Sequence, residues 1–119
     1  LSMPYLGYCK KEDTLYQHTR SFILSHHNPY YYQGTCASGI GSPHTPKNYI
    51  WHIALSMQGL TGTKEEAKKM INLILETSNN EGLCHEGFNK DEPSEYTRFW
   101  FAWANSLFAE LVYQTYFVK

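Results

Sequence analysis

A histidine and a glutamate stand side by side at His85 and Glu86, in the segment CHEGF, and this pair could do acid–base chemistry. One such chemistry is that of a zinc protease, in which H-E-x-x-H supplies two histidines to the metal and the glutamate acts as base. That motif requires a second histidine at position 89, where the chain has Asn89. The sequence therefore excludes a zinc protease site of this kind.

The chain contains three cysteines: Cys9, Cys36 and Cys84. Their spacing matches no zinc finger or zinc ribbon, and no spacing to a histidine selects a catalytic thiol. Free and mostly buried thiols are the simpler interpretation. We therefore predict no metal site and no cofactor.

Glu86 lies between Leu83-Cys84 and Phe88, which is an apolar setting for a carboxylate. It also precedes an aromatic segment that begins near Arg98. A carboxylate in such a place needs a partner, Arg98 or His85, to stay ionised. The residues alone leave two possibilities open, a functional carboxylate and an ordinary solvated loop glutamate.

Aromatic residues are frequent, at 16% of the chain. Flat rings line carbohydrate sites, where a few polar groups read the sugar hydroxyls. Trp51 and His44 are candidates for such contacts, with a loop histidine bonded to backbone as the alternative for His44. Aromatic residues at helical spacing are more often core, and we expect this of Trp103.

Four helical segments are predicted from apolar periodicity and end signals. Thr63 and Glu66 form a capping box before one of them, and Thr45-Pro46 is a good start for another. The segments are about residues 11–25, 45–60, 64–78 and 95–117. The last is apolar nearly all round, so we expect it to be buried on most sides. No convincing period-two strand is present, and the pattern predicts an all-α fold.

The loop of residues 25–46 is too long for an ordinary connector, which favours a functional loop. Its turn from Gly39 to Ser42 lacks the phosphate-loop pattern G-x-x-x-x-G-K-[ST]. We expect these glycines to let the backbone approach a ligand closely or reverse sharply before the next helix.

Composition and charge limit the possible partners of this 119-residue chain, which is 42% hydrophobic and 18% charged. Its formal net charge is −1 and it has no basic block, which argues against nucleic acid and anionic membrane as partners. No apolar run has the length of a membrane span. The chain starts at Leu1 without a readable signal peptide, so we expect mid-protein sequence.

The segments GIGSPHTPKNYIWHIAL and CHEGF…DEPSEYTRFWFAWANSLFAEL, together with MPYLGY and NPYYYQG, resemble glycoside hydrolase family 125, the exo-α-1,6-mannosidases. The similarity runs from Leu1 to about Leu111 and joins separate motifs in the right order. It implies an (α/α)6 barrel in which residues 1–119 form the C-terminal part, made of helical hairpins. It also implies metal-independent release, with inversion, of mannose from the non-reducing ends of a mannose-containing oligosaccharide or N-glycan.

The resemblance also implies roles for individual residues. The family's base is the glutamate of the H-E motif, which corresponds to Glu86, and its general acid lies upstream of Leu1. Sugar contacts carried over with less support are His44, Thr45, Trp51, His85 and Arg98. Two alternatives remain: another (α/α)6 glycosidase acting on a different glycan, and a non-catalytic glycan-binding or helical interaction module.

Overall fold

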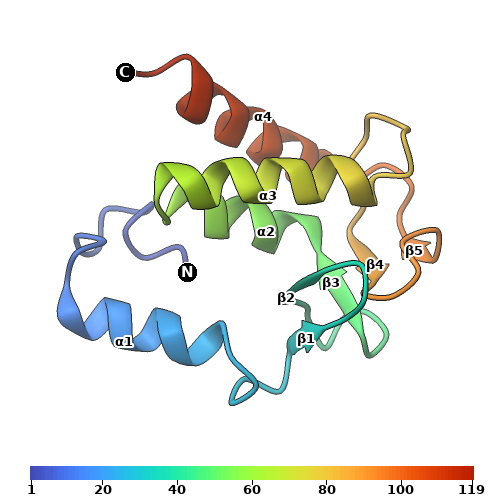
Figure 1. Cartoon of the computed structure of the whole chain (residues 1–119), viewed down its shortest axis with the longest axis horizontal. Helices are drawn as coiled ribbons and strands as arrows, with labels where there is room; N and C mark the ends of the chain where they lie inside the picture. Colours follow the sequence, from blue (N-terminus) through green and yellow to red (C-terminus); the bar gives the residue numbers. More distant parts are fainter.

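The computed structural model describes residues 1–119 and contains four helices and five short strands (Figure 1). The helices are α1 (Thr14–Ile23), α2 (His52–Leu60), α3 (Lys64–Thr77) and α4 (Ala102–Tyr116). The strands are β1 (Tyr31–Gln33), β2 (Ser38–Ile40), β3 (Tyr49–Trp51), β4 (Gly87–Asn89) and β5 (Tyr96–Thr97). The prediction of an all-α part of an (α/α)6 barrel is therefore wrong, because the chain mixes helices with two small antiparallel sheets.

The two sheets explain why the prediction failed. β1 pairs with β2, and β3, β4 and β5 form a three-stranded antiparallel sheet in that order. Each strand has only two or three residues, and β3 buries a single side chain, Ile50. Such a strand is too short to show the alternation that identifies a strand in a sequence.

Pairing in the second sheet also moves two helix starts. The segment predicted to begin near Thr45 becomes helical only at His52, because residues 49–51 pair with β4. The segment predicted from Glu95 becomes helical only at Ala102, because Tyr96 and Thr97 pair with β4. In contrast, α3 begins directly after Thr63, whose side chain accepts the Glu66 N–H at 3.1 Å, so the predicted N-cap is confirmed. The Glu66 carboxylate accepts from Arg20 and Gln58, and the reciprocal bond of a capping box is not formed.

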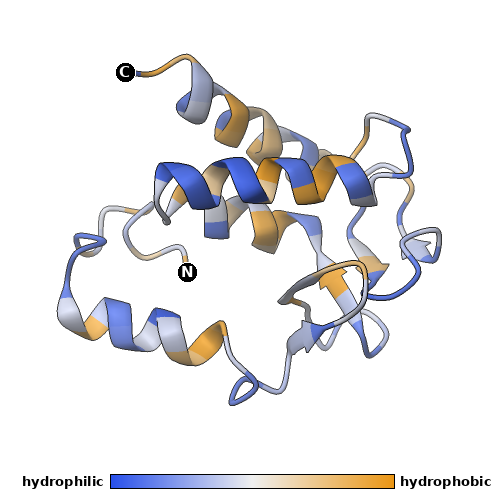
Figure 2. Ribbon diagram, in the orientation of Figure 1, coloured by the Kyte–Doolittle hydropathy of each residue, from blue (hydrophilic) through white to orange (hydrophobic).

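The core lies where α2 packs between α3 and α4. Leu55, Ile74 and Leu111, one from each helix, are almost completely buried. α2 and α4 cross closely at Gly59, where an added Cβ would lie 2.8 Å from Leu111 Cδ1. In Figure 2 the ribbon of α3 changes between hydrophilic blue and hydrophobic orange along its length, as expected for a half-buried helix.

α1 is joined to this core by a half-buried arginine. Arg20 donates to the Gln58 carbonyl and to the Glu66 carboxylate, both at 2.9 Å, and so links α1 to α2 and α3. At the start of the chain, the Tyr16 hydroxyl donates to the Leu1 carbonyl at 2.9 Å. None of the four helices is long and apolar enough to span a membrane.

Candidate active site

The three-stranded sheet brings distant parts of the chain together around Glu86. Trp51 lies opposite Gly87 in the register of β3 and β4, and Gly87 lies opposite Thr97 in that of β4 and β5. The Glu86 N–H donates to the Thr97 carbonyl at 3.1 Å, which extends the pairing by one residue. Trp51, Glu86 and Arg98 therefore meet at one end of the sheet.

A cavity of about 580 Å³ lies at this end. Its walls combine one carboxylate, one guanidinium, one imidazole and three aromatic rings. The lining residues are His44, Trp51, Glu86, Arg98, Phe101 and Trp103. Four of the six residues predicted for the site thus share one cavity, whereas Thr45 and His85 do not line it.

Glu86 and Arg98 form an ion pair with 3.3 Å between Glu86 Oε2 and Arg98 Nε. The Glu86 side chain is 17% exposed and that of Arg98 65%. The Arg98 guanidinium also lies 5.6 Å from the centre of the Phe101 ring. That separation is within the range of a cation–π contact. An ion pair this exposed contributes at most about 1 kcal/mol to stability, so its value to the fold is small.

The backbone of Arg98 has φ of 52°. This angle is in the left-handed region that residues with a Cβ seldom occupy. Such a conformation costs about 1–3 kcal/mol, and residues held in it cluster at functional sites. Here it occurs directly after β5, at the residue that pairs with Glu86. The geometry therefore places backbone strain next to the carboxylate.

Thr45 lies behind the cavity wall and orients Trp51. The Trp51 indole N–H donates to Thr45 Oγ1 at 2.9 Å, and Thr45 itself is buried. The loop before it passes close to β3 at Gly41, where an added Cβ would lie 2.1 Å from the Tyr49 carbonyl oxygen. The close approach at this glycine is thus to β3, and an approach to a ligand stays a prediction. The approach to β3 fixes the loop that carries His44 to the cavity.

His85 is fully buried and faces the protein interior. Its Nδ1–H donates to the Phe99 carbonyl at 2.9 Å, since a carbonyl can only accept. Its ring stacks on Tyr96 with centres 3.9 Å apart and planes at 3°. A direct contact between His85 and substrate stays a prediction, while its contacts in the structure are those of a residue that anchors the Glu86 segment.

Sequence reasoning missed two walls of the cavity, Phe101 and Trp103. Trp103 was expected in the core, but it is 70% exposed and lines the cavity, so that expectation is wrong. Phe101 meets Trp51 edge to face, with ring centres 6.4 Å apart, and lies 5.4 Å from Trp103. The signal that could have identified them is the position of FWFAW directly after Arg98, at the start of a helix.

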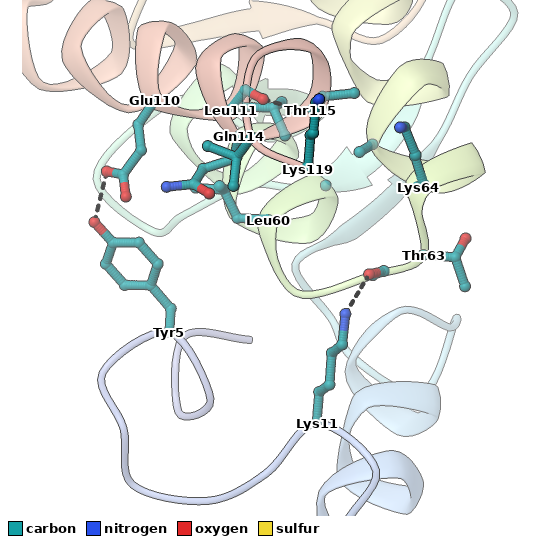
Figure 3. A pocket seen from close by; sticks show the side chains of 14 residues that line it. Tyr5, Lys11, Leu60, Thr63, Lys64, Glu110, Leu111, Gln114, Thr115 and Lys119 are labelled. Carbon is teal, nitrogen blue, oxygen red and sulfur yellow. Dashed lines mark hydrogen bonds between the residues drawn. The ribbon is translucent and has the colours of Figure 1, made fainter.

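A second cavity, of about 480 Å³, lies between the N-terminal segment, the α2–α3 turn and the end of α4 (Figure 3). Its one lining side-chain carboxylate, Glu110, accepts the Tyr5 hydroxyl at 2.8 Å, and Lys11 donates to the Gly62 carbonyl at 3.3 Å. These polar groups already bond to each other or to backbone. This cavity is therefore a weaker candidate for acid–base chemistry than the one at Glu86.

No three histidine, cysteine, aspartate or glutamate side chains are grouped closely enough to hold a metal ion. The cysteines are all free, as predicted, but only Cys84 is buried. Burial raises the pKa of the Cys84 thiol to about 11. A thiol with a raised pKa is a poor nucleophile. The chemistry available at the candidate site is thus that of a carboxylate among aromatic rings.

The chain is similar to known proteins over nearly its whole length. The family described as "Metal-independent alpha-mannosidase (GH125)" matches residues 1–113. The "Meiotically up-regulated gene 157 protein" of Schizosaccharomyces pombe is 41% identical over 114 residues, which cover 94% of this chain and 22% of that protein. The chain therefore spans about a fifth of the length of this curated relative.

A solved structure from Streptococcus pneumoniae is also similar, with 50% sequence identity and a TM-score of 0.94. The match covers 96% of this chain and 27% of that chain. The solved protein is described as one of a family of metal-independent alpha mannosidases, in a non-productive substrate complex with alpha-1,6-mannobiose. Because the family match extends over nearly the whole sequence, the chain belongs to the metal-independent alpha-mannosidase family GH125.

Proposed function

We propose that this chain supplies the general base, Glu86, to a glycoside hydrolase that releases terminal α-1,6-linked mannose with inversion and without a metal ion. The observation that carries the proposal is the Glu86 carboxylate, 3.3 Å from Arg98 Nε, in a cavity walled by aromatic rings. Family membership supports the broader activity of an alpha-mannosidase. The complex of the S. pneumoniae relative with alpha-1,6-mannobiose supports a mannose-containing oligosaccharide or N-glycan as substrate.

In the proposed mechanism Glu86 removes a proton from a water molecule as the water oxygen attacks the anomeric carbon. The bond from that carbon to the leaving oxygen breaks, and a general acid protonates the leaving group. Inverting glycosidases hold these two carboxyl groups about 6.5–9.5 Å apart, which leaves room for the water. Arg98 supports the role of Glu86 by holding the carboxylate in place, with its Nε 3.3 Å from Glu86 Oε2.

The general acid is proposed to come from residues outside this chain. Among the side chains that line the cavity, Glu86 alone is a carboxylate. The aromatic rings of Trp51, Phe101 and Trp103 offer flat surfaces for the apolar faces of a sugar, and they suit a transition state with positive character. His44 is proposed to hydrogen-bond a sugar hydroxyl, with Thr45 holding the Trp51 ring in place.

The linkage can be tested with isomeric mannobioses and a full-length protein carrying this sequence. We expect mannose release from the α-1,6 isomer and much slower release from the α-1,2 and α-1,3 isomers. Proton NMR of the first product should show the β-anomer. Equal hydrolysis of all isomers would contradict the linkage, and an α-anomer would contradict inversion. Binding of the glycan without any product would favour the non-catalytic module.

Replacing Arg98 tests whether its ion pair with Glu86 contributes to catalysis or to stability. Arg98→Lys keeps the charge but loses the planar guanidinium. We expect kcat/KM to fall about 10-fold, less than the 10²-fold that a misplacement of about 1 Å can cost. The free energy of unfolding should change by less than about 1 kcal/mol, because the pair is exposed. Steady-state kinetics and thermal unfolding of the full-length protein provide both measurements.

Arg98→Gly is the matched control, because it removes the side chain and also relieves the left-handed backbone conformation at this position. Glycine adopts positive φ without strain, so this variant should be at least as stable as the original while its kcat/KM falls further. If Arg98→Lys loses stability and its folded fraction has normal kinetics, then Arg98 is a structural residue.

A further inference from the structure

Two buried histidines lie directly behind Glu86. His52 is the first residue of α2, and His85 is the residue before Glu86. Both are fully buried, and their rings lie 5.5 Å apart. The proposed mechanism uses neither ring, although fully buried histidines are uncommon and need hydrogen-bond partners.

The hydrogen bonds of His52 determine where its proton lies. His52 Nδ1 is 2.9 Å from the backbone nitrogen of His85 and accepts its N–H, so Nδ1 carries no proton. The single proton of a neutral imidazole is then on Nε2 and is donated to Thr77 Oγ1 at 2.9 Å. Burial, with the neighbouring His85 second, lowers the pKa of His52 to about 3, so the ring is neutral in ordinary buffers.

Thr77 completes this chain of hydrogen bonds. Its hydroxyl donates to the Leu73 carbonyl at 2.7 Å, which leaves the oxygen free to accept from His52. The bonds therefore run in one direction, from the His85 N–H through His52 and Thr77 to a carbonyl of α3. If Nδ1 carried the proton instead, two donors, His52 Nδ1–H and the His85 N–H, would face each other and no hydrogen bond could form between them.

The segment that contains His85 and Glu86 is also bonded to residues 97–99. The His85 ring donates to the Phe99 carbonyl, the Glu86 N–H donates to the Thr97 carbonyl, and Arg98 lies between those two acceptors. The backbone is therefore fixed on both sides of Arg98, by Glu86 at Thr97 and by His85 at Phe99. The bond from His85 N–H to His52 connects this arrangement to the helical core.

We propose that His52, which accepts the His85 N–H and donates to Thr77, is a positioning residue that sets the location of the Glu86 carboxylate. This inference rests on the proposed role of Glu86 as the base. A base must lie within about 2.6–3.2 Å of the proton it removes, and a misplacement of about 1 Å can cost 10²-fold in rate. Thr77 is on α3 and does not line the cavity, and the bond that links its side chain to the Glu86 segment is the one to His52.

The test acts on Thr77, because replacing His52 would also remove packing from the core. In a full-length protein carrying this sequence, Thr77→Val keeps the shape of the side chain but removes the acceptor for His52 Nε2–H. We expect kcat to fall about 10-fold with KM changed less than about 2-fold, as for a misplaced base. Thr77→Ser retains the hydroxyl and should restore most of the turnover.

Thr115→Val is the matched control for the substitution itself. Thr115 is buried like Thr77, and its hydroxyl donates to the carbonyl four residues earlier, Leu111, at 2.7 Å. It has no histidine partner and lies outside the Glu86 cavity. We expect normal turnover in Thr115→Val, and a smaller loss of thermal stability than in Thr77→Val, because Thr115→Val leaves no buried donor unpaired.

A readout independent of turnover is the nitrogen-15 NMR spectrum of the His52 ring. The original protein should show the Nε2–H form alone. Thr77→Val should keep this form, because His52 Nδ1 still accepts the His85 N–H, but it should shift the Nε2 signal of His52 and the His85 amide signal. An unchanged spectrum in Thr77→Val would overturn the inference, as would equal turnover losses in Thr77→Val and Thr115→Val.

The proposed function and this inference can fail separately. An inactive Glu86→Gln variant beside normal turnover in Thr77→Val would overturn the positioning role alone. Normal turnover in Glu86→Gln would overturn the role of Glu86 as base, and the positioning role with it.

Discussion

Glu86→Gln in a full-length protein carrying this sequence is expected to lower kcat by about 10²- to 10⁴-fold, the usual cost of losing a general base. Glutamine keeps the size of the side chain and can still accept a hydrogen bond from Arg98. It cannot accept the proton of the attacking water, so the loss should fall on kcat and leave glycan binding in place. Mannose release and binding of alpha-1,6-mannobiose by calorimetry measure the two effects.

Glu76→Gln is the matched control, since Glu76 is an exposed residue of α3 outside the cavity. Its turnover should equal that of the original protein. If Glu86→Gln turned over substrate at the normal rate, Glu86 would not be the base. Loss of glycan binding together with turnover would instead indicate that Glu86 mainly contacts the sugar.

The pairing of Glu86 with Arg98 could be anticipated from the sequence because it follows from a simple requirement. A carboxylate between apolar residues needs a cation, and only a few were near enough in the chain to serve. The structure pairs it with Arg98, whereas His85 takes a different role because its ring donates to a backbone carbonyl. Local signals of this kind, like the cap at Thr63, depend on neighbours in sequence and are readable there.

Features set by distant pairing could not be anticipated. β5 forms only because Tyr96 and Thr97 pair with β4, and this pairing delays α4 and exposes Trp103 at the cavity. The link from His85 through His52 to Thr77 joins three segments, and its members are 33 and 25 residues apart in sequence. Nothing in the periodicity of α2 distinguishes His52 from an ordinary core position.

Residues 1–119 expressed alone are expected to release no detectable mannose. An inverting glycosidase needs an acid as well as a base, and Glu86 is the single carboxylate that lines the cavity. Large apolar side chains are exposed on the segment, among them Leu15 at 76%, Phe117 at 72% and Trp103 at 70%. We therefore also expect the isolated segment to associate. Assays with α-1,6-mannobiose, size-exclusion chromatography and binding of a hydrophobic dye test both expectations.

The Glu86→Gln variant of the same segment is the control for contaminating mannosidases, which would act equally in both preparations. Activity that survives purification and disappears in Glu86→Gln would mean that the segment holds both carboxylates. The acid would then be Asp91, Glu92 or Glu95, which lie on the connection from β4 to β5. Because that connection is close to Glu86 in the chain, a shift of the hairpin could bring one of them to the cavity. A monomer with a sharp unfolding transition would show that residues 1–119 form a domain of their own. It would also show that the exposed aromatic side chains do not have to pack against the rest of a larger protein.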